Sequence, residues 1–213
     1  EDEIASAKKK WLEEWMPILE SDEEPIAYYR VIQELNNTLD LENSIVTHDA
    51  GAPRDCLVPF YKATQPHSYI GWGKTTHLGF GIPLMIGAKL AQPNKFCVNV
   101  MGDGAFGMSG TDIETAARSQ VPITTILLNN SAMATYTGNN RGAIGEDART
   151  IYGISNMYGD YTKIAEGMGA TGIKVTLTKD IAPALKKAQK LNEDGITVLI
   201  EVMTNIEERR SKF

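Results

Sequence analysis

The sequence predicts one α/β domain: a three-layer fold in which a parallel sheet carries helices on both faces. Short β-branched or apolar runs alternate with helix-length segments along most of the chain. A glycine-rich turn directly follows one of these runs, as in the strand-turn-helix units of parallel sheets. The 213 residues are 42% hydrophobic and 23% charged, enough for one sizeable core and too apolar for a disordered chain.

The chain starts with a segment expected to precede the domain itself. Residues 1–24 mix Trp11, Trp15, several acids and the run Lys8-Lys9-Lys10 at helical spacing. This pattern predicts an amphipathic helix or linker that leads into the domain, with the charge run as a solvated face. The domain is expected over residues 25–213.

The domain is expected to begin with a helix and to continue as alternating strands and helices. Apolar residues recur every three or four positions from Ile26 to Leu39, and Pro25 suits a first helical turn. Strands are expected at 44–47, 96–101, 124–128, 172–175 and 197–202, and further helices at 78–90, 109–118, 161–168 and 181–191. Residues 134–159 lack a clear element, which favours a functional lid or a ligand-ordered segment. Ligands of such sheets bind at the carboxyl ends of the strands.

Composition excludes several classes of function. The 21 basic and 27 acidic side chains leave a net charge of −6, which argues against nucleic acid or an anionic membrane as the main partner. Two cysteines, Cys56 and Cys97, form neither a disulfide framework nor a paired-cysteine zinc site, and fit a reducing cytoplasm. No apolar run is long enough for a membrane span. The start, Glu1-Asp2-Glu3, is not a signal peptide and lacks an initiator Met, so we expect a processed or excised piece.

The glycine-rich turn at residues 102–107 matches the G-x-G-x-x-G pattern of dinucleotide-binding folds. A nucleotide-dependent oxidoreductase would need an acidic residue at the end of the next strand, where the chain has Asn129-Asn130. Asp103 would also repel a pyrophosphate at this turn unless a divalent cation lay between the two.

The motif therefore favours a cation-bridged anion over a dinucleotide. Asp103 and Asn130 follow two expected neighbouring strands and offer oxygen ligands suited to Mg²⁺ or Ca²⁺. The Gly104 and Ala105 amides, with the following helix, would donate to a diphosphate. In the alternative, purely structural interpretation, Asp103 forms a tight turn and Asn130 caps a helix.

Gly102-Asp103-Gly104, followed 27 residues after Asp103 by the second asparagine of Asn129-Asn130, resembles a known cofactor motif. It is similar to the thiamine-diphosphate-binding motif of the acetolactate synthase and pyruvate decarboxylase superfamily. The resemblance extends from about Pro25 to Thr204 and covers the diphosphate-binding domain of acetolactate-synthase-like enzymes. Segments that carry it are 78–83, 86–91, 112–118, 164–170 and 198–202. It implies the thiamine-diphosphate-binding fold, with thiamine diphosphate and Mg²⁺ as cofactors.

The resemblance also implies roles for individual residues. The metal ligands would be the side chains of Asp103 and Asn130 and the backbone carbonyl of Ala132. Contacts to the cofactor would come from Gly51, Ala52, Thr76, His77, Leu78, Gly102, Asp103, Gly104, Ala105 and Asn130. Pro53 departs from the pattern of a diphosphate-binding loop because it has no N–H to donate.

Two positions are expected to act on the reactive part of the cofactor. Leu78 falls where the family places a bulky aliphatic residue that bends the cofactor; the alternative is that it only begins a buried helix. The carbonyl of Thr76 would accept a hydrogen bond from the cofactor's 4′-amino group. His77 could face the substrate or be a structural histidine. Arg54, Met133, Tyr136 and Arg141 lie in segments that could line the substrate side, and no role is assigned to them.

The function implied by the resemblance is C–C bond formation or cleavage. Acetolactate-synthase-like relatives decarboxylate a 2-oxo acid and transfer the acyl group; alternatives are a 2-hydroxyacyl-CoA lyase, a 2-oxo acid decarboxylase subunit or a non-catalytic cofactor-binding domain. The family's catalytic glutamate comes from a pyrimidine-binding domain, which no segment here encodes. We therefore expect that domain or subunit as a partner, a small 2-oxo acid or 2-hydroxyacyl substrate, and an oligomeric, cytoplasmic enzyme.

Overall fold

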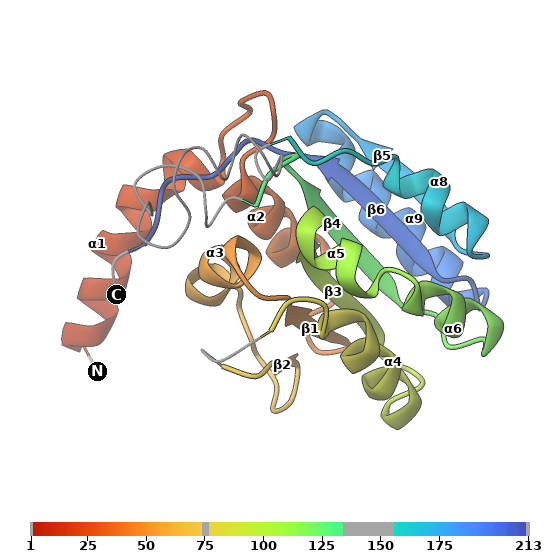
Figure 1. Cartoon of the computed structure of the whole chain (residues 1–213). Helices are drawn as coiled ribbons and strands as arrows, with labels where there is room; N and C mark the ends of the chain where they lie inside the picture. The colour runs from red at the N-terminus through yellow and green to blue at the C-terminus, as the bar shows by residue number, and fades with distance from the viewer. Residues whose placement is uncertain (1, 74–76, 134–155, 212–213) are drawn as a thin grey trace.

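The computed structural model describes residues 2–73, 77–133 and 156–211, and it confirms the predicted parallel α/β fold. Six parallel strands form one sheet in the order β2-β1-β3-β4-β6-β5, with helices on both sides (Figure 1). The strands are β1 (Ser44–His48), β2 (Tyr69–Ile70), β3 (Phe96–Gly102), β4 (Thr124–Asn129), β5 (Thr171–Val175) and β6 (Val198–Met203). All five predicted strands are present, with ends within one residue of those expected.

The helices cover both faces of this sheet and create two separate cores. The first core contains residues of α1 (Asp2–Leu19), α2 (Tyr28–Thr38), α3 (Ala52–Phe60) and α9 (Ile181–Glu193). The second contains residues of α4 (Gly81–Ala91), α5 (Asp103–Ser109), α6 (Asp112–Arg118) and α8 (Tyr161–Gly167). A short 3₁₀ helix, η2 (Thr178–Asp180), precedes α9.

Strand β3 shows why these runs form buried parallel strands. Val98 and Val100 face the first core, whereas Cys97 and Met101 face the second. Because both faces are covered by helices, six of the seven β3 residues are buried, and buried and exposed residues do not alternate along the strand. β3 pairs with both β1 and β4, so the segments that follow these three strands meet at one edge of the sheet.

The prediction that Pro25 begins the first helix of the domain is wrong. Helix α2 begins at Tyr28, and Ile26 forms an isolated parallel bridge with Thr204. The Ile26 N–H donates to the carbonyl of Met203, and the Ile26 carbonyl accepts from the N–H of Asn205. Its backbone is therefore engaged with the chain after β6, although its side chain keeps the apolar period of the helix.

Several other elements differ from the expectation. α3 and β2 were not predicted, because α3 contains two prolines in nine residues and β2 is only two residues long. α5 begins at Asp103 itself and is separate from α6, where one helix was expected over 109–118. α4 begins at Gly81 rather than 78, since Gly79 has a φ of 93°, which is incompatible with a helix. Of the expected lid at 134–159, residues 134–155 lie outside the described residues.

Helix α1 lies against α2 and α3 through its aromatic side chains. The Trp11 ring stacks on Phe60 with centroids 4.5 Å apart, and Trp15 is buried next to Tyr29. The run from Lys8 to Lys10 is exposed, as expected of a solvated face. Among the helices that the structure describes, none has both the length and the apolarity needed to cross a membrane.

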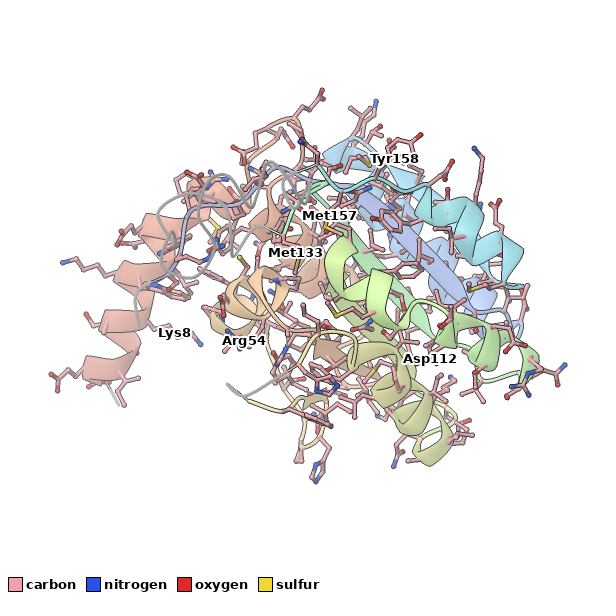
Figure 2. All side chains as sticks on the ribbon, in the orientation of Figure 1. Lys8, Arg54, Asp112, Met133, Met157 and Tyr158 are labelled. Carbon is pink, nitrogen blue, oxygen red and sulfur yellow. The ribbon has the colours of Figure 1, made fainter. Side chains whose placement is uncertain are left out.

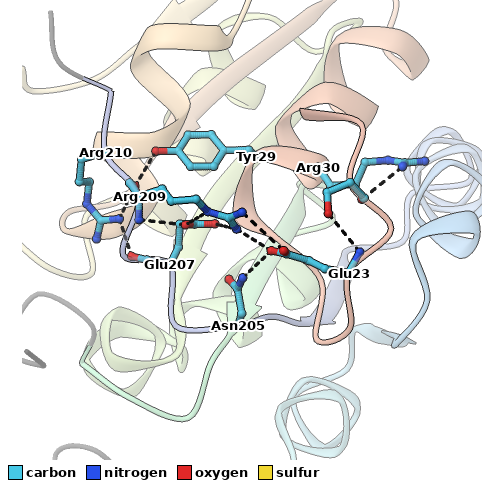
Figure 3. Close-up of polar contacts among 8 residues, drawn as sticks. Glu23, Tyr29, Arg30, Asn205, Glu207, Arg209 and Arg210 are labelled. Carbon is cyan, nitrogen blue, oxygen red and sulfur yellow. Dashed lines mark hydrogen bonds and ion pairs between the residues drawn. The ribbon is translucent and has the colours of Figure 1, made fainter. Parts of the chain in front are cut away.

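A polar network holds the chain after β6 against this helical side (Figure 3). The Arg209 guanidinium pairs with the carboxylates of Glu23 and Glu207, and the Tyr29 hydroxyl donates to the carbonyl of Arg209. The Asn205 amide also donates to Glu23 at 2.7 Å. These pairs, with the Glu207 hydrogen bond as the largest cause, raise the pKa of Arg209. The network fixes the course of the last described residues.

Candidate functional site

A cavity of about 250 Å³ lies at the carboxyl edge of the sheet. Four segments line it: residues 50–54 after β1, Leu78 before α4, residues 102–105 after β3, and residues 132–133 after β4. Tyr28, at the start of α2, also lines it. These segments meet because β1, β3 and β4 are parallel neighbours, so their carboxyl ends lie side by side.

Asp103 is the central charged residue of this cavity. It is only 2% exposed and forms the first residue of α5, where its Oδ1 accepts from the N–H of Gly104 at 2.8 Å. Its Oδ2 is buried and makes no hydrogen bond with the described residues. Burial raises the pKa of this carboxyl to about 6, against the smaller opposing effect of backbone N–H groups such as that of Gly104. Within the described residues, no cationic side chain forms an ion pair with this carboxylate.

Asn130 and Ala132 belong to a tight turn that directly follows β4. The Asn130 Oδ1 accepts from the N–H of Ala132 at 2.9 Å, and its Nδ2 donates to the Tyr28 hydroxyl at 2.9 Å. Between them, Ser131 has a φ of 56°, in the left-handed region. Ala132 is buried and lines the cavity, whereas Asn130 borders it through Tyr28 and Ala132. The expected metal ligands thus lie at the ends of adjacent strands, β3 and β4.

The donor set of this site fits a hard divalent cation. One carboxylate, one side-chain amide oxygen and one backbone carbonyl are the oxygen ligands that Mg²⁺ accepts, with water or phosphate completing the coordination. The unpartnered Oδ2 of Asp103 is the oxygen that such an ion would neutralise. No group of three or more His, Cys, Asp or Glu side chains suited to a metal occurs in the described part of the chain.

The first turns of two helices border the same cavity. α3 begins at Ala52 after Gly51, whose φ of 84° favours glycine, and α5 begins at Asp103. N–H groups in the first turn of a helix have no partner within the helix and favour an anion. Pro53, which lacks an N–H, occupies this first turn at no cost to the helix. The cavity therefore combines an unpaired carboxylate with two helix starts that favour negative charge.

Asp49 organises the wall that carries Leu78, a role that the sequence did not indicate. This fully buried carboxylate accepts from the N–H groups of Ala50 at 2.7 Å and of Gly79 and Gly81 at 2.9 Å. Its own N–H donates to the carbonyl of Val100 in β3. The segment before α4 is therefore tied to the end of β1, which holds the partly buried Leu78 at the cavity wall.

Tyr28 is a second residue of the site that sequence reasoning missed. Its ring is 2% exposed and lines the cavity, while its hydroxyl accepts from Asn130. Burial, with the nearby charge of Asp103 as a smaller cause, raises the pKa of this hydroxyl. Its position two residues after the Ile26 bridge brings α2 to the edge of the sheet. No sequence signal distinguishes it from the other apolar positions of that helix.

Of the remaining predicted residues, some line the cavity and others do not. His77 is exposed, and its ring contacts Trp72 and Phe80 rather than the cavity, at centroid distances of 5.0 and 6.0 Å. Thr76 lies outside the described residues, as do Tyr136 and Arg141. Arg54, on α3, and Met133, after β4, both line the cavity, and both are labelled in Figure 2.

A comparison with protein-family models gives a match over the part of the chain that contains most of the cavity residues. The model described as "Thiamine pyrophosphate enzyme, C-terminal TPP binding domain" matches residues 49–202. The match runs from Asp49 to Val202 and so includes Leu78, Asp103 and Asn130.

Curated relatives match most of this chain but only part of their own length. A probable acetolactate synthase large subunit from Methanocaldococcus jannaschii is 28% identical over 199 residues, which cover 87% of this chain and 33% of the relative. A sulfoacetaldehyde acetyltransferase from Castellaniella defragrans is 31% identical over 184 residues, covering 82% of this chain and 29% of the relative. The chain thus spans about a third of the length of these relatives.

A solved structure supports the fold. The thiamine diphosphate-dependent 4-hydroxybenzoylformate decarboxylase from Rhodococcus jostii RHA1 superposes with a TM-score of 0.73. The alignment is 24% identical and covers 89% of this chain and 34% of that one.

Proposed function

This chain belongs to the thiamine pyrophosphate enzymes, as a C-terminal TPP-binding domain, and on that premise we propose that it is the thiamine-diphosphate- and Mg²⁺-binding module of an acetolactate-synthase-like enzyme that forms or cleaves C–C bonds. One observation carries the cation part of the proposal. The Asp103 Oδ2 is buried at a cavity wall without a hydrogen-bond partner among the described residues, and an anion would be repelled there unless a cation intervened.

The proposed roles follow the geometry of the cavity. Asp103, the Asn130 side chain and the Ala132 carbonyl would hold Mg²⁺. The N–H groups at the starts of α3 and α5, from Gly51–Ala52 and Gly102–Ala105, would donate to the diphosphate. These residues neutralise a doubly anionic group by a bound ion and by backbone dipoles, which suits a chain with a net charge of −6.

The other wall would position the reactive end of the cofactor. When bound, thiamine diphosphate supplies an electron sink for the electrons of the cleaved C–C bond. Leu78 would support its bent shape and exclude water, since an apolar side chain imposes shape without exchanging protons. The Thr76 carbonyl is proposed as an acceptor for the 4′-amino group. His77 is proposed to lie near a part of the cofactor other than its diphosphate group.

Acyl transfer is the reaction class that we propose. The relatives described above are named an acetolactate synthase large subunit and a sulfoacetaldehyde acetyltransferase, and the second name supports acyl transfer. The substrate class that we propose from the family resemblance is a small 2-oxo acid or 2-hydroxyacyl compound, for which lyase chemistry is the alternative. The chain spans about a third of their length. We therefore propose that residues 25–213 form the diphosphate-binding domain, led by the helix in residues 1–24. A pyrimidine-binding domain or subunit, at an interface with the cavity, would supply the catalytic glutamate.

The decisive experiment measures cofactor binding with and without the cation. Thiamine diphosphate binding to the native protein is followed by calorimetry in Mg²⁺ and in EDTA. We expect binding that needs Mg²⁺, and Asp103→Ala should abolish this Mg²⁺-dependent binding. The control, Asp112→Asn, changes a carboxylate at the start of α6, which does not line the cavity, and should retain it. Unchanged binding by Asp103→Ala would contradict the metal bridge.

The dependence on a partner domain is tested separately. This chain, mixed with thiamine diphosphate, Mg²⁺ and pyruvate, is expected to show no turnover until a pyrimidine-binding domain is added. Robust turnover by the chain alone would contradict the proposal that its active site needs a second domain.

A further inference from the structure

We propose that Glu201 is a positioning residue for the cation-binding turn, acting through Asn129. This inference rests on the proposed function, because it concerns the same metal site. Glu201 lies on β6, next to β4, and its register partner is Leu127, two residues before Asn129. It does not line the cavity, so it would act on the site only through other residues.

The Glu201 carboxylate is buried on a face of the sheet that packs against an apolar core. It is 0% exposed and lies on the same side of β6 as Leu199, which belongs to the second core. A buried carboxylate is costly unless it accepts hydrogen bonds. Its Oε1 accepts from the Asn129 Nδ2 at 2.7 Å, while its Oε2 has no partner among the described residues. The Asn129 contact is therefore its main hydrogen bond.

Asn129 connects this carboxylate to the turn that carries the expected ligands. Its Oδ1 accepts from the backbone N–H of Ser131 at 3.0 Å, and the Ser131 hydroxyl lies 3.4 Å from the same oxygen. Ser131 has a φ of 56°, a left-handed conformation that is strained for a non-glycine residue and needs support from its surroundings. Asn129 provides that support, and Asn130 and Ala132 lie on either side of Ser131.

Glu201 decides which way the Asn129 amide points. The Glu201 Oε1 accepts from the Asn129 Nδ2, so the NH₂ end of the amide faces Glu201. The carbonyl end must then face Ser131, where it meets an N–H donor. If the amide were turned over, its NH₂ group would meet the Ser131 N–H, and the turn would lose its acceptor. One buried acceptor oxygen thus selects the amide orientation on which the turn depends.

The ion pair of Glu201 with Lys174 does not explain its position. The Lys174 Nζ lies 3.6 Å from the Glu201 Oε1, but that lysine side chain is 47% exposed on β5, at the edge of the sheet. An ion pair to a half-exposed lysine contributes little. Lys174 therefore gives a matched variant that touches Glu201 without touching Asn129.

The test measures the Mg²⁺ concentration that half-saturates thiamine diphosphate binding in the native protein, with thermal unfolding of the same samples. Glu201→Leu should raise this concentration about tenfold to a hundredfold, the range for residues that orient metal ligands. Glu201→Gln, which keeps a carbonyl oxygen for Asn129, should recover most of the loss. Lys174→Met should leave the value unchanged. Val202→Ala should also leave the value unchanged, although it lowers stability. Val202 lies on the same strand but faces the first core, where the smaller side chain leaves a void.

A double variant separates positioning from general destabilisation. If Glu201 acts through Asn129, Asn129→Ala combined with Glu201→Leu should need no more Mg²⁺ than Asn129→Ala alone. Additive effects, or a lower unfolding temperature with an unchanged Mg²⁺ requirement, would overturn the inference. Should Glu201→Leu fail to fold, a folded Asn129→Ala with an unchanged requirement would overturn it as well. If the unaltered protein binds without Mg²⁺, the proposed function fails together with this inference.

Discussion

Asp103→Asn is expected to stabilise the cofactor-free protein while removing its response to Mg²⁺. Burial raises the pKa of Asp103 from 3.8 to about 6. Because the folded protein holds this proton more tightly than the unfolded chain, stability is highest at low pH. It is lost as the pH rises from about 4 to about 6. Two pKa units correspond to about 3 kcal/mol, and above pH 6 the free energy of unfolding is lower by this full amount.

The asparagine variant avoids this cost. Its side-chain oxygen can still accept from the Gly104 N–H, which Asp103 accepts at 2.8 Å, but it carries no charge to bury. We expect the variant to be more stable than the parent by about 2–3 kcal/mol at pH 7.5 in EDTA, and the difference to vanish near pH 4. Adding Mg²⁺ and thiamine diphosphate should stabilise only the parent protein, by the mass action of a ligand that binds the folded state.

The assay is urea denaturation at pH 4.5 and 7.5, in EDTA and in Mg²⁺ with thiamine diphosphate. Asp112→Asn serves as the matched control and should change stability by less than about 0.5 kcal/mol at both pH values, as surface substitutions usually do. Two results would refute the reasoning: a pH-independent difference between parent and Asp103→Asn, or equal stabilisation of both by the cofactor.

Three further substitutions probe the walls of the cavity. Asp49→Ala removes the acceptor of three buried N–H groups and is expected to cost about 3 kcal/mol in urea denaturation; a loss below about 1 kcal/mol would mean that the segment before α4 is held by other contacts. Tyr28→Phe removes the hydroxyl that accepts from Asn130 and should cost about 1 kcal/mol and raise the Mg²⁺ requirement severalfold; loss of stability alone would place Tyr28 outside the site. Leu78→Ala is expected to lower kcat at least about tenfold with cofactor binding largely kept, as measured by calorimetry and by steady-state kinetics with the pyrimidine-binding domain added; an equal loss in cofactor affinity would contradict a positioning role.

The local sequence pattern was sufficient to predict five strands and the position of the central motif. The strands around Val98 and Ile126 are mostly apolar and almost fully buried because helices cover both faces of a parallel sheet, and this signal can be recognised without knowing the partner strand. Asp103 and Asn130 were placed at adjacent strand ends by the strand-helix rhythm and by the resemblance, and β3 pairs with β4 as expected. Their cofactor roles remain predictions.

The sequence pattern predicted the wrong element where backbone hydrogen bonding overrides it. Ile26 keeps the apolar period of a helix but pairs with Thr204, far along the chain. α3 was missed because Pro53 and Pro59 suggest a loop, whereas a proline in the first turn of a helix leaves no hydrogen bond unmade. These outcomes depend on which backbone groups find partners, and sequence periodicity does not report that.

By itself, the sequence determined the fold class, the family resemblance and the carboxylate and amide expected to hold a cation. Those features are local: an apolar run, a glycine-rich turn and the spacing of two polar residues. Only the tertiary structure decided that Asp49 ties down the wall of Leu78, that Tyr28 receives the Asn130 amide, and that Glu201 orients Asn129. Each of these contacts joins residues 30 or more positions apart, and burial in a folded sheet is what makes each partner obligatory.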